Sequence, residues 1–365
     1  MGVELPTDFK CPISLEIMSD PVILSSGHTF DRPSIQQWLD AGHRTCPISK
    51  LPLPQPPSLI PNHSLRSLIS TYTLLSFPQP FHPNPQSLIH LLISRSSHME
   101  EKLNSLDQLR RLCKGDPSIR PRLAESGAVP AVLNCIDSGE PRLQEKALLL
   151  VLNLSLDDDS KVGLVAEGVV AKVVYALHCG VGDSRAVAAT VLTSLAVLEV
   201  NRVTIGSFPD AIPGLVSLLQ MGGARERKEA ATALFTLCSF SDNRARAIQS
   251  GAVPILIQNA ASGLERAVEV LGLLAKCKLA RDEMLRFCGV LDILIGIVRN
   301  GSSRGVQFAL LTLSSLCCYS DKMGMEASRE GLIETCVGLL EDDNEKVRRN
   351  AKMLIQILQG KSKNV

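Results

Sequence analysis

The sequence has few aromatic residues and no excess of charge of either sign. Only 4% of its 365 residues are aromatic, with a single Trp, although 45% are hydrophobic. Its apolar content is therefore mainly Leu, Val, Ala and Ile, which favours helices packed through aliphatic side chains. The formal net charge of +1 gives no global indication of a nucleic-acid partner or of an anionic membrane surface.

Paired cysteines and long apolar runs are also missing. The chain has 11 Cys, yet no two of them form a Cys-x-x-Cys pair, so we expect reduced thiols that mostly pack as small apolar groups. No apolar run is long enough to span a bilayer, and the N-terminal residues lack the pattern of a secretory signal. We therefore expect a cytoplasmic protein, which could also enter the nucleus, without membrane insertion.

Motifs for covalent chemistry on this chain are scarce. There is no P-loop and no H-E-x-x-H pattern. Neither Cys11 nor Cys46 lies in a recognisable basic environment that would orient and activate a thiolate. We expect no catalytic nucleophile and no cofactor.

Prolines divide the chain into two parts. Residues 78–85 hold four Pro in eight positions, which predicts an extended linker. Residues 5–77 precede it and mix Pro, Gly, His and short apolar runs. Residues 86–359 follow it with an almost purely helical pattern, and residues 360–365 form a polar tail.

The long second part repeats. A phrase such as ESGAVPAVL recurs roughly every 41 residues, and a second phrase such as VLNLS follows it at a constant offset. A helical repeat of this length with a glycine break is typical of the armadillo or HEAT class. We expect about six stacked units with one continuous core, an imperfect first unit and a charged final helix as a cap. The breaks fall near Gly127, Gly168, Pro209, Gly251, Gly289 and Gly331.

The first part contains the tetrapeptide Cys-Pro-Ile-Ser twice, at residues 11–14 and 46–49. Each copy looks like half of a zinc knuckle whose second cysteine is serine, and the remaining His and Cys residues are not paired as a zinc site requires. We expect no metal. The local pattern predicts a hairpin of residues 21–24 and 28–32, a helix that has Pro33 in its first turn, a loop, and a last helix capped by Asn62.

Five pieces of this part resemble one known family in order and spacing. FKCPISLEIMSDPV, GHTFDR, IQQWL, TCPIS and LIPNHSLRSLI are similar to a U-box, the zinc-free relative of the RING finger. A U-box followed by armadillo repeats resembles the plant U-box–armadillo ubiquitin ligases. The resemblance implies a mostly α protein, with a small α+β U-box of hairpin, helix, loops and C-terminal helix ahead of an armadillo-type α-solenoid.

The resemblance also implies a mechanism. A U-box docks a ubiquitin-conjugating enzyme that carries ubiquitin as a thioester and promotes direct transfer to a substrate lysine, as RING-type ligases do, with no ubiquitin intermediate on its own chain. It places Ile13, Leu15, Trp38 and Pro47 in the docking surface and Lys50 at a ubiquitin-positioning site. Trp38 could instead belong to the core, and Lys50 could be a solvated loop lysine. The alternative function is a non-catalytic armadillo adaptor with a degenerate U-box.

Without zinc, a U-box must hold its loops by hydrogen bonds and ion pairs over an apolar core. We expect the polar network to comprise Asp20, His28, Asp31, Arg32, Ser49 and Asn62. The expected core residues are Val22, Ile23, Phe30, Ile35, Leu39, Leu53, Leu65 and Leu68.

The repeats are expected to hold the protein substrate in their groove. Basic residues gather where the long helix of each unit begins, which favours an acidic or phosphorylated partner. Glu residues lie among them, so the alternative is a solvated face of mixed charge. The family resemblance suggests a receptor-kinase cytoplasmic region as partner. The predicted groove residues are Asn153, Arg185, Arg227, Lys228 and Arg266.

Overall fold

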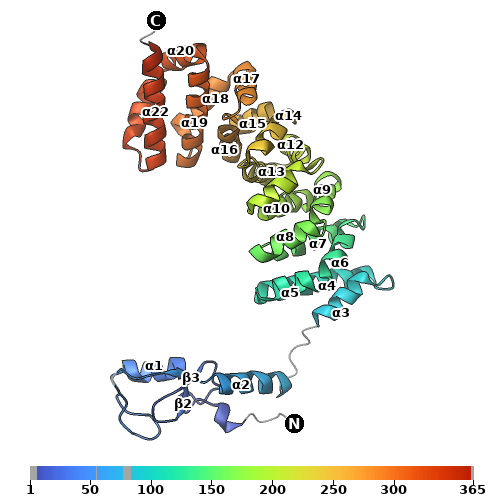
Figure 1. The fold of residues 1–365 in the computed structure, drawn as a ribbon, viewed down its shortest axis with the longest axis vertical. Coiled ribbons are helices and arrows are strands. Elements are labelled where there is room, and N and C mark those ends of the chain that lie inside the picture. Colours follow the sequence, from blue (N-terminus) through green and yellow to red (C-terminus); the bar gives the residue numbers. More distant parts are fainter. Residues whose placement is uncertain (1–5, 55, 77–83, 363–365) are drawn as a thin grey trace. The chain divides into compact units, whose positions relative to one another are not determined.

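The computed structural model describes the backbone of residues 6–54, 56–76 and 84–362. The chain divides into two compact units, Met1–Pro83 and Asn84–Val365. The first is a small α+β module and the second is a stack of helices (Figure 1). This is the fold class that the sequence predicts.

The N-terminal module is built on a three-stranded antiparallel sheet with strand order β2-β1-β3. A 3-10 turn precedes the sheet. Val22 in the central strand lies opposite Phe30 in β2 and Pro61 in β3. The predicted hairpin is therefore present, whereas the third strand was not expected. The elements are η1 Thr7–Phe9, β1 Pro21–Ile23, β2 Thr29–Asp31 and β3 Ile60–Pro61.

Two helices complete the module. Helix α1, Arg32–Asp40, has Pro33 in its first turn as predicted and buries Ile35 and Leu39. Helix α2, His63–Ser76, begins where the Oδ1 of Asn62 accepts a hydrogen bond from the backbone N–H of Leu65 at 3.0 Å, which confirms the predicted cap.

The core of the module differs from the prediction at one clear position. Leu68 is 54% exposed, and its neighbour Ile69 takes the buried place instead. Ile23 and Leu65 are half-buried. The other expected core residues, Val22, Phe30, Ile35, Leu39 and Leu53, are buried together with Phe9, Met18 and Leu24.

The helical unit begins earlier than predicted. Helix α3, Pro85–Ile93, is capped by Asn84, whose side chain accepts a hydrogen bond from the N–H of Gln86. Proline is tolerated in the first turn because its missing N–H has no helical partner there. The predicted linker thus ends before Asn84, and its residues 78–83 lie outside the described residues. At the other end, α22, Glu345–Ser362, extends into the predicted tail.

The repeats follow as three-helix units after the two-helix start of α3 and α4, Met99–Gly115. Residues 84–362 contain six such units. Each unit begins with the short helix that precedes the glycine turn. They are α5 Ile119–Glu125, α6 Ala128–Ile136, α7 Pro141–Leu154; α8 Asp158–Ala166, α9 Val169–Cys179, α10 Ser184–Leu195; α11 Glu199–Ser207, α12 Ala211–Met221, α13 Ala224–Leu237; α14 Ser241–Gln249, α15 Ala252–Ala261, α16 Glu265–Leu274; α17 Lys278–Arg286, α18 Val290–Asn300, α19 Ser303–Tyr319; and α20 Asp321–Arg329, α21 Leu332–Gly338 with the 3-10 turn η2 Leu339–Glu341, and α22.

The turn between the first and second helix of each unit needs a left-handed residue. Gly127 has φ 79° and Gly251 has φ 74° at this turn, a conformation that suits glycine because it lacks a Cβ. In the third unit the same position is Asp210, with φ 60°, directly after the predicted break at Pro209. Five of the six predicted breaks therefore fall on the turn residue itself, and the sixth falls one residue before it.

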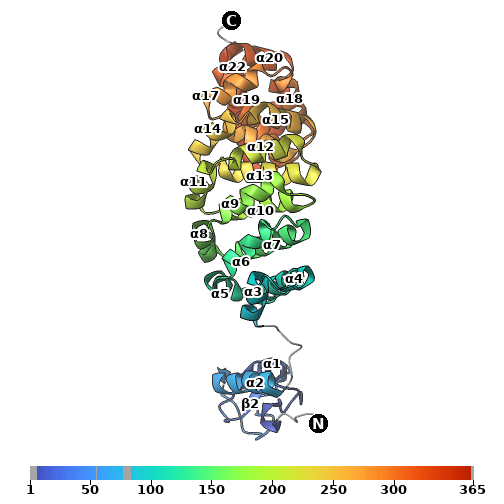
Figure 2. The same cartoon turned by 90° about the vertical axis from the view of Figure 1, so that its right-hand side faces the viewer.

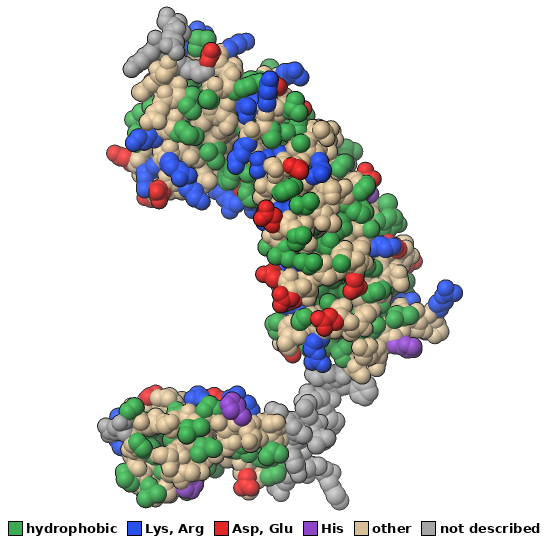
Figure 3. All heavy atoms as spheres, viewed as in Figure 1, with side chains coloured by type: hydrophobic (Ala, Val, Ile, Leu, Met, Phe, Trp, Pro, Cys, Tyr) green, Lys and Arg blue, Asp and Glu red, His purple; other side chains and the backbone are tan. Residues whose placement is uncertain are grey.

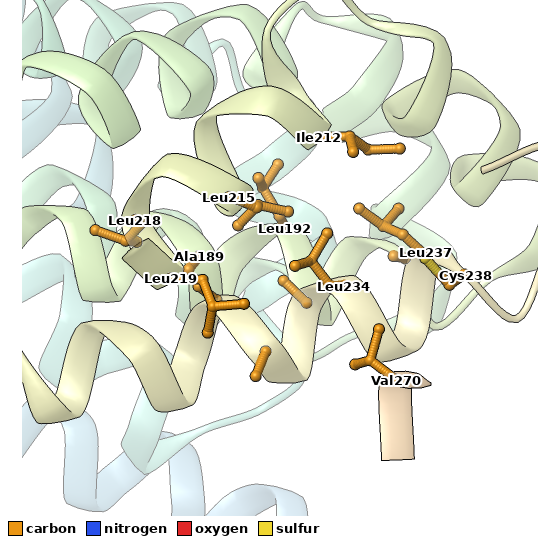
Figure 4. Packing of buried hydrophobic residues seen from close by; sticks show 14 of the residues in the cluster. Ala189, Leu192, Ile212, Leu215, Leu218, Leu219, Leu234, Leu237, Cys238 and Val270 are labelled. Atoms are coloured by element: carbon orange, nitrogen blue, oxygen red, sulfur yellow. The ribbon is translucent and has the colours of Figure 1, made fainter. Parts of the chain in front are cut away.

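The stacked units share one core. Second helices lie on the outer side of this stack and third helices on its inner side (Figures 1 and 2). Leu192, Leu215, Leu234 and Val270 come from four different helices of three successive units and belong to one buried cluster (Figure 4). No single helix among the described residues is long and apolar enough to cross a membrane, although α8 and α9, which meet at an 80° bend, satisfy the length and composition test as a pair.

Candidate functional site

The repeated tetrapeptide forms the same turn twice. The backbone N–H of Leu15 donates to the carbonyl of Cys11 at 2.8 Å, and the N–H of Lys50 donates to the carbonyl of Cys46 at 3.0 Å. Leu15 and Lys50 both have positive φ, 62° and 58°. Left-handed backbone is costly for residues with a side chain and often marks a functional loop. The module therefore presents two equivalent loops with strained tips.

The tips of the two loops carry exposed apolar side chains. Leu15 is 72% exposed, and Ile48 in the second loop is 46% exposed. The predicted Ile13 and Pro47 are only half-buried, and Ile13 also packs against the core of the module. Ile48 was not predicted, although it occupies in the second tetrapeptide the place that Ile13 has in the first.

Trp38 connects helix α1 with the second loop. Its Nε1–H donates to the carbonyl of Thr45 at 3.0 Å, and its ring stacks on His43 with centroids 3.9 Å apart. The Nζ of Lys50 lies 5.9 Å from the centre of the indole ring. The ring is half-buried. One part of it packs against the core of the module, and the rest is exposed beside the second loop.

The second loop is held through the thiol of Cys46. This thiol lies 3.9 Å from the Nδ1 of His28. Burial raises the pKa of Cys46, but hydrogen bonds from Ser26, Ser49 and nearby backbone amides outweigh burial and lower the pKa to about 7. Both serine hydroxyls are buried beside this thiol. Ser26 was not predicted, and the spacing Ser26-x-His28 is the signal that could have found it.

Cys11 plays the corresponding part in the first loop. Its sulfur accepts a hydrogen bond from the backbone N–H of Asp31 at 3.3 Å. Burial raises the pKa of Cys11, but this hydrogen bond and those from Ser14 and Ile13 bring the pKa below its ordinary value. Both loops are therefore tied to the module through sulfur atoms that accept hydrogen bonds.

Asp20 is the centre of an ion-pair cluster. It lies 2.6 Å from the Nε of Arg32 and also pairs with Arg66, which was not predicted. The hydrogen bond from Arg32 holds the pKa of Asp20 below its ordinary value of 3.8. Because Arg66 lies in α2, this cluster joins the last helix to the sheet.

Asp31 and Asn62 supply the remaining predicted polar contacts. The Oδ1 of Asp31 accepts hydrogen bonds from the backbone N–H groups of Ser19 at 3.0 Å and Asp20 at 2.7 Å. The Nδ2 of Asn62 donates to the Oγ1 of Thr29 at 3.4 Å. Across residues 6–54, 56–76 and 84–362, no group of three or more His, Cys, Asp or Glu is arranged to hold a metal ion.

In the helical unit, the predicted groove residues behave differently from one another. Contrary to the prediction, Asn153 is only 7% exposed, and its Nδ2 donates to the carbonyl of Leu149 in its own helix at 2.7 Å. Arg185 is paired with Glu226 of the next unit at 2.8 Å. These two side chains serve the stack rather than a partner.

Arg227 and Lys228 have no ion pair among the described residues. Lys228 is exposed and Arg227 is half-buried. They are therefore the predicted groove cations that remain available to a partner.

Arg266 belongs to a cluster that spans several units. Arg266 and Arg304 both bind the buried carboxylate of Glu269, at 2.6 Å and 2.8 Å. The guanidinium of Arg266 lies 5.2 Å from the centre of the Phe235 ring. Phe235 in turn meets Phe308 edge to face, with centroids 5.9 Å apart.

Gly272 of α16 leaves the space for this aromatic contact. A Cβ added at Gly272 would lie 2.8 Å from the Cδ1 of Phe308. The two rings come from α13 and α19, which belong to units on either side of the unit that contains α16.

Ser303 lies in a sequence pattern that is typical of serine hydrolases. Residues 301–305 match G-x-S-x-G, a pattern that we did not expect in this chain. The central Ser303 begins α19 directly after α18, whereas a nucleophile elbow follows a strand. Its Oγ accepts a hydrogen bond from the Nδ2 of Asn344 at 2.9 Å. This serine therefore has a structural partner rather than a catalytic base.

The two units together define a protein with a RING-like loop module followed by an armadillo-type stack. The family model described as "U-box domain" matches residues 5–75, and the model "Plant U-box protein ARM repeat region" matches residues 88–365. The chain belongs to the plant U-box family with armadillo repeats.

Two relatives from Arabidopsis thaliana illustrate the range of similarity. U-box domain-containing protein 8 is 56% identical over 369 residues, which cover 99% of each chain. E3 ubiquitin-protein ligase PUB23 is 28% identical over 385 residues, which cover 97% of this chain and 93% of the relative.

Solved structures are similar in fold alone. An engineered protein aligns with a TM-score of 0.66 at 20% identity, over 76% of this chain and 68% of its own. A structure from work on the interaction between cadherin and beta-catenin aligns with a TM-score of 0.65 at 16% identity, over 81% of this chain and 58% of its own.

Proposed function

We propose that this protein is a ubiquitin ligase of the RING type. Its N-terminal module would bind a ubiquitin-conjugating enzyme charged with ubiquitin, and its armadillo groove would hold the protein substrate. The name of the relative PUB23, an E3 ubiquitin-protein ligase, supports the class of activity. The observation that carries the proposal is the pair of equivalent loops whose exposed apolar tips, Leu15 and Ile48, accompany the half-buried Trp38.

The chemistry of the proposal is transfer without a covalent step on this chain. Cys46, whose pKa is lowered to about 7, is 0% exposed and its sulfur is occupied by hydrogen bonds, so it is poorly suited to accept ubiquitin as a thioester. The substrate lysine would attack the thioester of the conjugating enzyme directly. The module would contribute proximity and orientation.

Lys50 would assist by contacting ubiquitin. Its left-handed backbone fixes the side chain at the edge of the second loop, beside the ring of Trp38. An ammonium group offers a point charge without the planar geometry of a guanidinium. Lys50→Arg should therefore keep or increase transfer, whereas Lys50→Glu should reduce it.

Reconstituted ubiquitination tests the proposal. The full chain is incubated with activating enzyme, a panel of conjugating enzymes, ubiquitin and ATP, and ubiquitin chains are detected by immunoblot. Leu15→Ala and Trp38→Ala should lower chain formation, Trp38→Ala by about tenfold or more, because a central aromatic residue contributes about 2 kcal/mol to an interface. Leu68→Ala removes an equally apolar, 54% exposed side chain from α2, outside the loops, and should leave chain formation unchanged.

Circular dichroism of each variant excludes loss of fold, since Trp38 also packs against the core. An intact wild-type protein that forms no chains with any conjugating enzyme would contradict the proposal and favour a non-catalytic adaptor.

A further inference from the structure

A cavity of about 440 Å³ lies beside the C-terminal half of α19, where α16 and α17 meet on one side and α22 lies on the other. It is open to solvent. The side chains that matter for its chemistry are Lys276, Arg281, Ser314, Tyr319 and Met353.

Two polar atoms at this cavity are buried without a partner. The Oγ of Ser314, a residue only 3% exposed, and the Nε of Arg281 make no hydrogen bond within the described part of the chain. Buried polar groups are nearly always paired, because an unpaired one has lost its hydrogen bonds to water. Both atoms can donate a hydrogen bond, so they would pair with a hydrogen-bond acceptor bound in the cavity.

The repeats themselves show that Arg281 is unusual. Arg202 and Arg244 occupy the corresponding position in two earlier units, and each uses its Nε to donate to the carbonyl six residues before it, at 2.8 Å. Arg281 instead reaches the carbonyl of Ala275 with its Nη1, at 2.8 Å, and its guanidinium lies 4.7 Å from the centre of the Tyr319 ring. Arg281, which departs from the common arrangement, is one of the residues that line the cavity, and its Nε is left without a partner.

The charge of the cavity indicates the kind of acceptor. Its lining contains Lys276 and Arg281 and no Asp or Glu. The nearby Asp282 already accepts a hydrogen bond from the hydroxyl of Tyr319 at 2.7 Å. Lys and Arg also gather on the inner edge of the C-terminal half of the stack, whereas Asp and Glu gather on the inner edge of its N-terminal half (Figure 3). Met353, 39% exposed, adds an apolar wall.

We propose that this cavity recognises a glutamate side chain within an acidic segment of the substrate. The carboxylate would accept hydrogen bonds from Ser314 and Arg281 and would meet the ammonium of Lys276, while the methylene groups would pack against Met353. The inference rests on the proposed function in one respect, because it identifies the bound segment as part of the ubiquitination substrate. Binding of an acidic peptide can nevertheless be measured without any ubiquitin transfer.

Fluorescence anisotropy with the full chain tests the inference. The probe is a fluorescein-labelled peptide of alternating Glu and Leu, and its control replaces every Glu with Gln. The Glu peptide should bind about tenfold more tightly than the Gln peptide, because hydrogen bonds to a charged group are stronger than neutral ones. Added salt should weaken binding of the Glu peptide only.

Two matched variants locate the site. Lys276 and Lys278 are both exposed, but only Lys276 lines the cavity. Lys276→Gln should weaken binding of the Glu peptide about fivefold, and Lys278→Gln should change it less than twofold. Ser314→Ala should also weaken binding about fivefold, and it should leave thermal stability equal to or above that of the wild type, because the hydroxyl has no partner to lose.

Equal binding of the Glu and Gln peptides, or equal effects of the two lysine substitutions, would overturn the assignment. Failure of the proposed ligase function would appear separately, as a wild-type chain that binds the Glu peptide but forms no ubiquitin chains.

Discussion

Gly206 of α11 is the position where a single added carbon should do the most damage to the helical stack. A Cβ at this position would overlap the side-chain amide of Asn243 in α14 of the next unit. Asn243 is fully buried, and its Nδ2 donates to the carbonyls of Arg202 at 2.9 Å and Leu237 at 3.0 Å. Its Oδ1 accepts a hydrogen bond from Arg246 at 2.8 Å. The amide cannot move aside without giving up these bonds.

The magnitude follows from what Asn243 loses. Each bond to a backbone carbonyl contributes about 1 kcal/mol, and the bond from the Arg246 guanidinium contributes about 1.5–3 kcal/mol. Alanine returns about 1 kcal/mol, because glycine is less favourable than alanine in a helix. Gly206→Ala should therefore lower the free energy of unfolding by about 2.5–4 kcal/mol.

Urea denaturation of the full chain, followed by far-ultraviolet circular dichroism, measures this loss. Gly163→Ala in α8 is the control, since its added Cβ meets no atom within 4 Å and should stabilise by up to about 1 kcal/mol. In an Asn243→Ala background, Gly206→Ala should cost nothing further, because the clash has been removed. A Gly206→Ala protein as stable as the Gly163→Ala protein would refute the reasoning.

Three further predictions concern the ion pairs, the repeat turns and the metal independence of the N-terminal module. Trp38 is the single tryptophan of the chain, so its fluorescence reports on the folding of that module. Because the pKa of Asp20 is lowered in the folded state, its ion pairs stabilise the module above the ordinary pKa of 3.8 and are lost as the pH falls below it. Between about pH 5 and about pH 3, the melting temperature of the wild type should therefore fall more than that of Asp20→Asn, and equal slopes would contradict this. Asp210→Gly should raise the free energy of unfolding by about 1 kcal/mol in urea titrations, because it relieves a left-handed aspartate; a destabilised variant would contradict it. EDTA should leave the tryptophan fluorescence of the wild type unchanged, since hydrogen bonds and ion pairs hold the loops, and a shift toward the unfolded spectrum would count against that account.

The sequence predicts the order of elements well because their local signals are strong. Pro33 in the first turn of α1, Asn62 as the cap of α2 and glycine at the repeat turns each act through the conformation of one residue. Strand β3 could not be predicted in this way. It is only Ile60–Pro61, and its pairing depends on the neighbouring strand rather than on its own propensity.

The burial of single residues is harder to predict from the sequence than the helical periodicity of the apolar residues. Leu68 and Ile69 both fit a broad apolar stripe on α2, and only the packing against the sheet decides that Ile69 is the buried one. Asn153 fits the inner helix of its unit, yet its amide turns back to its own backbone. A helical hydrophobic pattern identifies the buried face of a helix only to within about one residue. It therefore cannot decide which of two adjacent residues is buried.

Contacts between units could have been predicted from the repeat length itself. Arg185 and Glu226 are separated by 41 residues, as are Asn243 and the carbonyl of Arg202. Opposite charges one period apart on third helices are thus candidates for ion pairs. The free Nε of Arg281 could not be predicted, because it results from a rotated guanidinium at an otherwise repeated position.

The contact between Phe235 and Phe308 has a consequence for how the stack unfolds. In most solenoids each unit touches only its neighbours, so that the ends can fray one unit at a time. The aromatic pair instead joins the first and third of three successive units across Gly272. These three units should therefore melt as one cooperative block, and fraying from the C-terminal end should halt once it reaches the unit that contains Phe308.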